Sequence, residues 1–391
     1  MSTASAMRAY RGPALFSFGF RPFFLFGSLW GALAAPLWVY VLAHDGGLAG
    51  RIGLDWHIHE MLFGYVGAIV GGFLLTAVPN WTGRYPVIGV RLAILFGLWA
   101  AGRAAMTLPG LDRLALAALD SAYFVALCAV IWREVIAGRN WRNLVVALAV
   151  TGLAASNLAF HLRPEGAGLD AAVRAGLAVV ILLLALIGGR VTPSFTRNWL
   201  ARCAPGPLPA PSSRFDLLVI VATVIATAAW VVRPELAAVG VALTATGALH
   251  FVRLARWAGW RTASQPLVWI LHLGYAWLAV GLILLGLAVL GAPFAPSAGL
   301  HALTAGAMGV MIMAMTTRAT RGHTGRELSA GAGTLILYIL INAAAAVRVA
   351  GGLWPVVHGE ALIVSSVLWA GALLGFAVLY GPMLARPRLR N

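Results

Sequence analysis

The chain has 391 residues, of which 61% are hydrophobic and only 10% are charged. A soluble protein of this length has no core large enough to hide so much apolar surface, so the composition excludes an ordinary soluble fold. The net charge of +16 comes from 28 basic residues, all of them Arg. These arginines lie between apolar runs and form no single basic face, so the charge does not indicate a nucleic-acid partner.

Apolar runs of 18 or more residues recur along the chain and predict an all-α polytopic membrane protein in a lipid bilayer. No short apolar core with a cleavage site follows the basic first residues, so the first run is expected to be a helix and not a signal peptide. Twelve transmembrane helices are expected, at 22–44, 57–79, 89–108, 115–137, 143–162, 170–188, 216–232, 235–255, 266–290, 299–317, 329–350 and 357–384.

The distribution of arginine predicts the topology. If the N-terminus is cytoplasmic, the inner segments hold 21 Arg and three acidic residues, and the outer segments hold seven Arg and nine acidic residues. This asymmetry follows the positive-inside rule, so both termini are predicted to be cytoplasmic. The segment 189–215 contains CAPGPLPAPSS and is expected to be a long, flexible cytoplasmic loop.

We predict a single transmembrane domain over 1–391, built from three four-helix repeats at 21–140, 141–262 and 263–385. The tripeptide Thr-Gly-Arg occurs at 82–84 and 324–326, and His59 and His301 each lie 23 residues before its Thr. The third helix of each predicted repeat carries an Arg near its outer end, namely Arg103, Arg233 and Arg348. The alternative explanation is that the positive-inside rule makes the inner ends of membrane helices look alike.

Six of the nine histidines are expected at outer helix ends: His44, His57, His59, His161, His301 and His358. His44 and His161 are interpreted as interface residues bonded to water or backbone. In the stretch DWHIHEM (55–61), residues two apart on a helix point about 200° apart, so His57 and His59 cannot both face one ion unless the helix starts between them. His57 shares a face with Glu60, whose carboxylate is expected to fix a histidine tautomer.

The spacing match favours His59 as half of a cross-bundle pair with His301. We favour a metal site here, with His358 among its candidate ligands, over a purely structural polar network.

His250 and His272 are expected at one depth near the cytoplasmic ends of neighbouring helices, where a buried imidazole needs a partner. The pair is predicted to bind a haem iron from its two faces, or a copper ion with a third donor such as His323 in the following inner loop. The alternative is a hydrogen bond between the two histidines, or to Tyr275, that fastens the two helices.

Other features have a structural and a functional interpretation. Gly67 and Gly71 indicate close helix packing, or room for a flat macrocycle. Met308, Met311, Met313 and Met315 are interpreted as packing residues rather than Cu(I) ligands. Arg84 and Arg326 are topology anchors that could also pair with haem propionates.

Several motifs together resemble the NnrS family over essentially the whole chain. They are FRPFFLFG (20–27), WHIHEMLFGY (56–65), GFLLTAVPNWTGR (72–84), ALH (248–250), PLVWILHLGYAW (266–277) and HALTAGAMG through RATRGHTGR (301–326). The resemblance implies a bacterial inner-membrane protein with haem and copper, linked to the nitric oxide response and to tolerance of nitrosative stress. The characteristic histidines of the family match His57, His59, His250, His272, His301 and His323.

Twelve helices in three groups of four are also similar in architecture to the catalytic subunit of haem–copper oxidases and NO reductases. That analogy places a low-spin haem between His59 and His301, but it offers no counterparts of the copper histidines of those enzymes. Because the chain has no CxxCH, the haem is expected to be a non-covalent haem b. The candidate cofactor-binding residues are His59, His301, His250, His272, Arg84 and Arg326.

The expected function is to bind and detoxify nitric oxide, reducing NO to N2O with electrons from quinol or a cytochrome. One alternative is a twelve-helix transporter, against which the helix interiors have few acids, Asp120 being expected as the only notable buried carboxylate. The other alternative is a haem protein that senses NO without turning it over.

Overall fold

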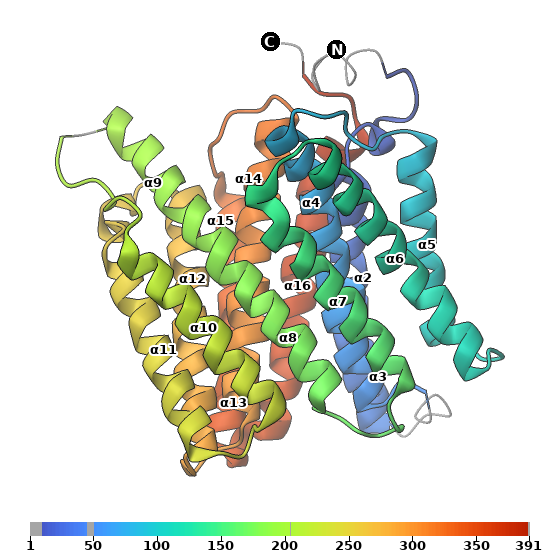
Figure 1. Cartoon of the computed structure of the whole chain (residues 1–391), viewed down its shortest axis with the longest axis vertical. Helices are drawn as coiled ribbons and strands as arrows, with labels where there is room; N and C mark the ends of the chain where they lie inside the picture. The colour runs from blue at the N-terminus through green and yellow to red at the C-terminus, as the bar shows by residue number, and fades with distance from the viewer. Residues whose placement is uncertain (1–9, 45–50, 204, 390–391) are drawn as a thin grey trace. The chain divides into compact units, whose positions relative to one another are not determined.

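The computed structural model describes residues 10–44, 51–203 and 205–389, and this part consists of helices joined by loops (Figure 1). Within it, twelve helical stretches are long and apolar enough to cross a membrane, which confirms the prediction of an all-α membrane protein with twelve spans. The spans are Phe20–His44, Leu54–Thr82, Val90–Thr107, Arg113–Ala137, Trp141–Leu162, Ala171–Cys203, Arg214–Val232, Ala237–Ala255, Pro266–Val289, Ser297–His323, Ala332–Leu353 and Pro355–Ala385.

Most spans are one α-helix: α2 (Phe20–His44), α5 (Val90–Thr107), α6 (Arg113–Ala137), α7 (Leu144–Leu162), α10 (Arg214–Val232), α11 (Ala237–Ala255), α12 (Pro266–Val289), α15 (Ala332–Leu353) and α16 (His358–Ala385). The second, sixth and tenth spans each consist of two α-helices joined by a π-helical segment. They are α3 (Leu54–His59), η2 (Glu60–Val66) and α4 (Gly67–Thr82); α8 (Ala171–Leu183), η4 (Leu184–Gly188) and α9 (Gly189–Cys203); and α13 (Ser297–His301), η6 (Ala302–Met308) and α14 (Gly309–His323).

The π-helical segments begin at corresponding positions in two of these spans. η2 starts directly after His59 and η6 directly after His301, and each has seven residues. A π-helix holds an extra residue per turn and occurs most often at functional sites. The three-repeat organisation stays a prediction.

The predicted loop 189–215 is helical over its first part, and the prediction is wrong there. α9 continues the sixth span to Cys203, because Thr192, Thr196 and Leu200 recur every four residues and form one buried face. The hydroxyl of Thr196 also donates to the carbonyl of Thr192. The tenth span likewise runs to His323, which was expected in a loop and ends α14 instead.

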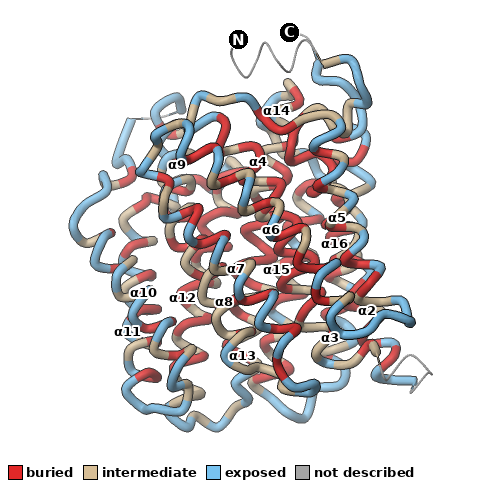
Figure 2. Tube along the Cα trace, turned by 45° about the vertical axis from the view of Figure 1, so that its right-hand side comes forward, coloured by how far each residue is buried: buried red, intermediate tan, exposed pale blue. Residues whose placement is uncertain are grey.

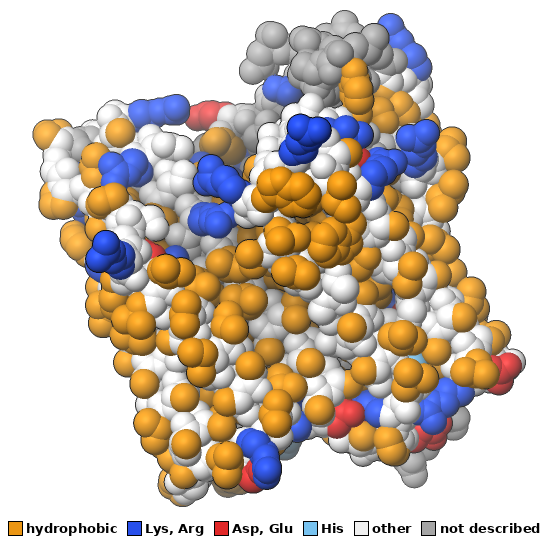
Figure 3. All heavy atoms as spheres, viewed as in Figure 1, with side chains coloured by type: hydrophobic (Ala, Val, Ile, Leu, Met, Phe, Trp, Pro, Cys, Tyr) orange, Lys and Arg blue, Asp and Glu red, His pale blue; other side chains and the backbone are white. Residues whose placement is uncertain are grey.

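Apolar side chains cover the surface between the helix ends, and charged side chains gather toward the ends (Figure 3). Peripheral helices such as α10 alternate between buried and exposed residues (Figure 2). The exposed residues of α10 include Leu217, Leu218 and Ile225, whereas Val219 and Trp230 are buried. An exposed face made of large aliphatic side chains is the surface that a lipid bilayer covers.

The chain divides into two compact units. The first comprises the described residues up to Val179, Thr320–Arg326 and those from Phe376, and the second comprises Val180–Ala319 and Glu327–Gly375. In the first unit, the Arg21 guanidinium donates to the carbonyls of Leu384 (2.8 Å) and Arg386 (2.7 Å). The start of α2 and the end of α16 therefore lie at the same end of this unit.

Glycines bring helices of the first unit close together. A Cβ on Gly67 would lie 2.8 Å from Phe124 Cζ, and one on Gly71 would collide with the Tyr123 hydroxyl. Both aromatic rings belong to α6, which packs against α4. These glycines therefore serve close packing, and side chains of α6 occupy the space that a macrocycle would need beside them.

Candidate functional site

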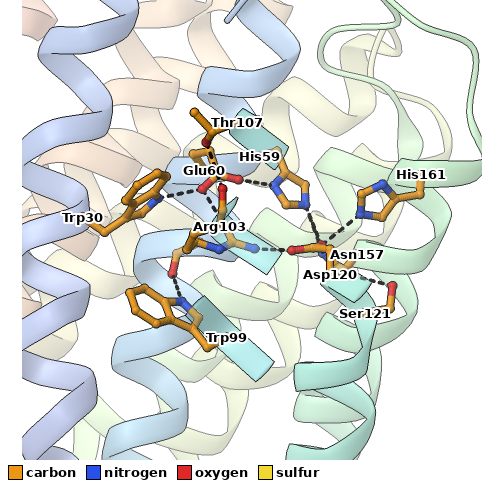
Figure 4. A network of polar contacts seen from close by, with 11 residues as sticks. Trp30, His59, Glu60, Trp99, Arg103, Thr107, Asp120, Ser121, Asn157 and His161 are labelled. Carbon is orange, nitrogen blue, oxygen red and sulfur yellow. Dashed lines mark hydrogen bonds and ion pairs between the residues drawn. The ribbon is translucent and has the colours of Figure 1, made fainter. Parts of the chain in front are cut away.

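A network of buried polar side chains lies inside the first unit (Figure 4). None of its charged or histidine members is more than 5% exposed. The network draws on five spans: Trp30 from α2, His59 and Glu60 from the α3–η2 junction, Arg103 from α5, Asp120 and Ser121 from α6, and Asn157 and His161 from α7.

Two glycines and a π-turn make room for the network. A Cβ on Gly64 would collide with Arg103 Nη1 and lie 2.8 Å from Glu60 Oε2, and a Cβ on Gly102 would lie 2.8 Å from Asp120 Oδ1. The Gly64 carbonyl, within η2, accepts a hydrogen bond from Trp99 Nε1 (2.9 Å). The absence of a Cβ at Gly64 and Gly102 therefore leaves the space that the polar side chains occupy.

Arg103 is the cation of the network. Its Nη1 donates to Glu60 Oε2 (2.8 Å), and its Nη2 pairs with Asp120 Oδ1. Trp30 Nε1 donates to the same Glu60 oxygen (2.6 Å). Two carboxylates thus face one guanidinium, so a neutral His59 would leave the cluster with an excess negative charge, and an uncompensated buried charge is costly.

His59 lies between the two carboxylates. Its Nδ1 is 2.9 Å from Glu60 Oε1, and its Nε2 is 3.0 Å from Asp120 Oδ2. A neutral imidazole has only one N–H, so one of these contacts would set a lone pair against a carboxylate. His59 therefore requires a positive partner, which is either a second proton or a metal ion.

Three side chains could share a metal ion. His161 Nε2 lies 2.9 Å from the same Asp120 Oδ2. The ligand atoms of His59, Asp120 and His161 all lie within 4.8 Å of one another, and all three residues are buried. Imidazole nitrogen and carboxylate oxygen are common ligands of first-row transition metals, and Glu60 behind His59 is the usual second partner of a ligating histidine.

The geometry corrects two interpretations. Glu60 bonds to His59 and not to His57. Trp30 and Arg103 hold the other oxygen of Glu60, and the His57 ring stacks on Trp38 at 4.1 Å. The interpretation of His161 as an interface residue is wrong, since it is buried against Asp120. Asn157 and His161 lie four residues apart, so a polar pair on one face of an apolar helix was a signal in the sequence.

The expectation of a single buried carboxylate is also wrong. Glu60, Glu134 and Asp216 are buried as well as Asp120. Each has an arginine partner: Arg84 Nε donates to Glu134 Oε2 (2.8 Å), and Arg253 Nε donates to Asp216 Oδ1 (2.9 Å). The hydropathy of a segment does not predict whether its carboxylates are buried, because the arginines that pair with them here come from distant parts of the chain.

In the second unit, His250 and His272 bond to hydroxyl groups. His250 Nδ1 is 2.8 Å from the Tyr275 hydroxyl, and its Nε2 is 2.9 Å from Thr223 Oγ1. His272 Nε2 is 2.8 Å from Thr196 Oγ1. The other side of the imidazole lies close to Gly259, where an added Cβ would be 2.6 Å from Nδ1 of His272. The Tyr275 bond was the structural alternative for His250; metal binding by this pair stays a prediction.

The remaining candidate residues occupy varied surroundings. His301 Nδ1 donates to the Ser297 carbonyl (2.7 Å), and His358 Nδ1 donates to the Gly351 carbonyl (3.0 Å). In both rings Nε2 is therefore the nitrogen that can coordinate a metal. His301 belongs to the second unit and His59 to the first, and their pairing stays a prediction.

The last three candidates, His323, Arg84 and Arg326, belong to the first unit. The His323 ring contacts Phe18 and Phe20, with centroids 5.4 and 5.5 Å apart. Arg84 is held by Glu134, and Arg326 Nη1 lies 3.4 Å from the Thr324 carbonyl. Their role toward haem propionates stays a prediction.

Comparison with models of known protein families gives a match over nearly the whole chain. The model of the NnrS protein family matches residues 14–388, which is nearly the full length. A search of curated proteins finds none with significant similarity. A family match of this extent covers all twelve spans and every residue of the buried network. The chain belongs to the NnrS family.

Proposed function

We propose that this protein contains haem and copper, resides in the bacterial inner membrane, and binds and removes nitric oxide during nitrosative stress. Membership in the NnrS family supports the link to nitric oxide, and the twelve spans support a membrane location. The observation that carries the proposal is the pair of imidazoles, His250 and His272, that are buried in two membrane-spanning helices. Ionisable groups inside such helices are expensive and are kept for function.

The described residues fit a haem group. An axial histidine needs one ring nitrogen fixed by a hydrogen bond and the other directed at iron. His301 and His358 meet this requirement, because each donates Nδ1–H to a backbone carbonyl. We propose that a haem b is held by one of these two side chains.

The described residues also offer a place for copper. His250 and His272 are buried imidazoles whose Nε2 atoms contact threonine hydroxyls, which can be exchanged for a metal ion. Tyr275 would then hold the His250 ring by its Nδ1. When bound, haem iron and copper would supply one-electron redox chemistry and a coordination position for NO.

Conversion of two NO to N2O and water consumes two electrons and two protons. We propose that the electrons come from quinol or a cytochrome. We propose that the protons reach the site from water, through groups of the protein that accept and release them. NO itself is small, uncharged and soluble in lipid, so it reaches the protein from the bilayer.

The test is made on purified protein in detergent. Absorbance and elemental analysis should give a Soret band together with iron and copper, and the reduced protein should consume NO without oxygen and release N2O. His272→Ala should lose copper, and His301→Ala should lose or alter the Soret band. His44→Ala serves as the control, because His44 is exposed and its contacts among the described residues are with Tyr40, whose carbonyl it bonds and whose ring it stacks on.

Each outcome separates the candidate functions. A Soret band that shifts with NO, without NO consumption, would make the protein a sensor. Preparations with neither haem nor copper would overturn the proposal and favour a transporter.

A further inference from the structure

One oxygen of Asp120 has three nitrogen neighbours. Oδ2 lies 3.0 Å from His59 Nε2, 2.9 Å from His161 Nε2 and 2.7 Å from Asn157 Nδ2. Asn157 Nδ2 also lies 3.1 Å from His59 Nε2. Four polar atoms from three spans thus surround one small volume, and all four residues are buried.

No placement of protons on a neutral His59 satisfies these contacts. If Nδ1 carries the proton and donates to Glu60, then the Nε2 lone pair faces the Asp120 carboxylate. If Nε2 carries the proton, the Nδ1 lone pair faces the Glu60 carboxylate, and the N–H of Nε2 competes with the amide N–H of Asn157.

A second positive charge satisfies these contacts, and it can be a proton or a metal ion. An imidazolium His59 donates from Nδ1 to Glu60 Oε1 and from Nε2 to Asp120 Oδ2. The Asp120 oxygen then also accepts from Asn157 Nδ2. A metal ion at the same place would be bound by the lone pairs of these atoms instead.

A metal ion between these atoms also satisfies the contacts, once the Asn157 amide is turned so that its oxygen faces the ion. We propose that His59 Nε2, Asp120 Oδ2, His161 Nε2 and the amide oxygen of Asn157 coordinate a non-haem divalent metal ion, namely iron(II). This site is distinct from the haem and the copper of the proposed function, and its existence does not depend on them.

The donors lie close enough together to share one ion. The ligand atoms of His59, Asp120 and His161 are within 4.8 Å of one another, and Asn157 lies against two of them. Four protein donors around an octahedral ion would leave two positions for small molecules.

The chemistry of the donors indicates iron(II). Two imidazoles with a carboxylate form the ligand set of non-haem iron(II), whereas Cu(I) prefers sulfur ligands and structural zinc prefers a tetrahedron. Glu60 holds the His59 ring by Nδ1, and Arg103 engages Asp120 Oδ1, so that Oδ2 remains for the metal. A divalent ion also reverses the excess negative charge of the network.

The experiment measures iron beyond the haem. Purified protein is stripped with a chelator and titrated with iron(II) in the absence of oxygen, and iron is counted against haem. The wild-type protein should bind one additional iron per chain. Asp120→Asn and His161→Ala should weaken that binding by at least tenfold, whereas His44→Ala should bind as the wild type does. NO added to the iron-loaded protein should give the electron paramagnetic resonance signal of a non-haem ferrous nitrosyl.

Asn157→Asp keeps the shape of the side chain and supplies a charged oxygen ligand, so it should tighten iron(II) binding. An added carboxylate raises affinity only where a cation binds among these side chains, so a network that binds no ion would show no gain. The proposal is overturned if folded Asp120→Asn and His161→Ala proteins bind iron as the wild type does. It is equally overturned if Asn157→Asp does not bind more tightly. Loss of haem with retained non-haem iron would contradict only the proposed function.

Discussion

At the scale of single residues, Arg103 is the arginine that compensates the charge of two buried carboxylates. It is 4% exposed and contacts both Glu60 and Asp120. Its sequence context, an Arg near the expected outer end of an apolar helix, served only as one mark of the predicted repeats. The pairing that gives Arg103 its role comes from carboxylates 43 and 17 residues away.

Removal of this guanidinium should strongly destabilise the protein. Arg103→Met leaves two buried carboxylates without a cation, and breaking a buried ion pair by removing one partner costs about 3–5 kcal/mol. The melting temperature in detergent should fall by many degrees. Adding Glu60→Gln to this variant should recover part of the loss, because one unpaired charge then disappears.

The matched control is Arg233→Met. Arg233 pairs with Glu235 across 3.8 Å, and both side chains are more than 60% exposed. Exposed pairs contribute little, so the melting temperature should stay near that of the wild type. If both substitutions lowered the melting temperature equally, Arg103 would not be needed to compensate the buried carboxylates.

At the scale of elements, the π-helical segment η2 sets the direction of His59 and Glu60 relative to α4. A π-turn holds one residue more than an α-turn, so deletion of Leu62 should restore α-helical register and rotate the histidine by about 100°. The deletion should abolish binding of the non-haem iron. Deletion of Ser212, in an exposed loop, is the control. Iron binding that survives the Leu62 deletion would mean that the π-turn does not position the site.

Contact between α4 and α6 gives a second test at this scale. Gly71→Ala places a methyl group against the Tyr123 hydroxyl, and overpacking of this kind costs about 1–3 kcal/mol. Tyr123→Phe removes the clashing oxygen, so the double variant should be more stable than Gly71→Ala alone. A double-mutant cycle on melting temperatures measures this coupling, and simple additivity of the two effects would count against the contact.

Some elements could be predicted from the sequence and others could not. All twelve spans follow from hydropathy, because a membrane helix must be apolar over about 20 residues whatever it packs against. The extension of α9 to Cys203 did not follow, since its mean composition is polar and only the face with Thr192 and Thr196 is buried. The three π-helical segments have no established signal in a single sequence.

At the scale of the whole molecule, the arginine distribution predicts orientation. The start of α2 and the end of α16 meet in the first unit, as an even number of spans requires. A fluorescent protein fused to either terminus should therefore fluoresce in the cytoplasm, and alkaline phosphatase inserted after Gly110 should be active on the outer side. Phosphatase activity from a fusion at the C-terminus would reverse the topology.

The sequence by itself determined the class of fold, the number of spans, the family and the histidines that merit attention. Those properties depend on composition and local order, which each segment carries alone. The tertiary structure decided which groups meet. In the folded protein, His59 contacts Asp120 of α6 and Asn157 of α7, and His161 of α7 contacts the same Asp120 oxygen. Glu60 forms its hydrogen bond with His59, whereas helical spacing in the sequence predicts it beside His57. Such partnerships depend on the rotation and depth of each helix against its neighbours, which packing sets and a linear pattern of apolar residues does not record.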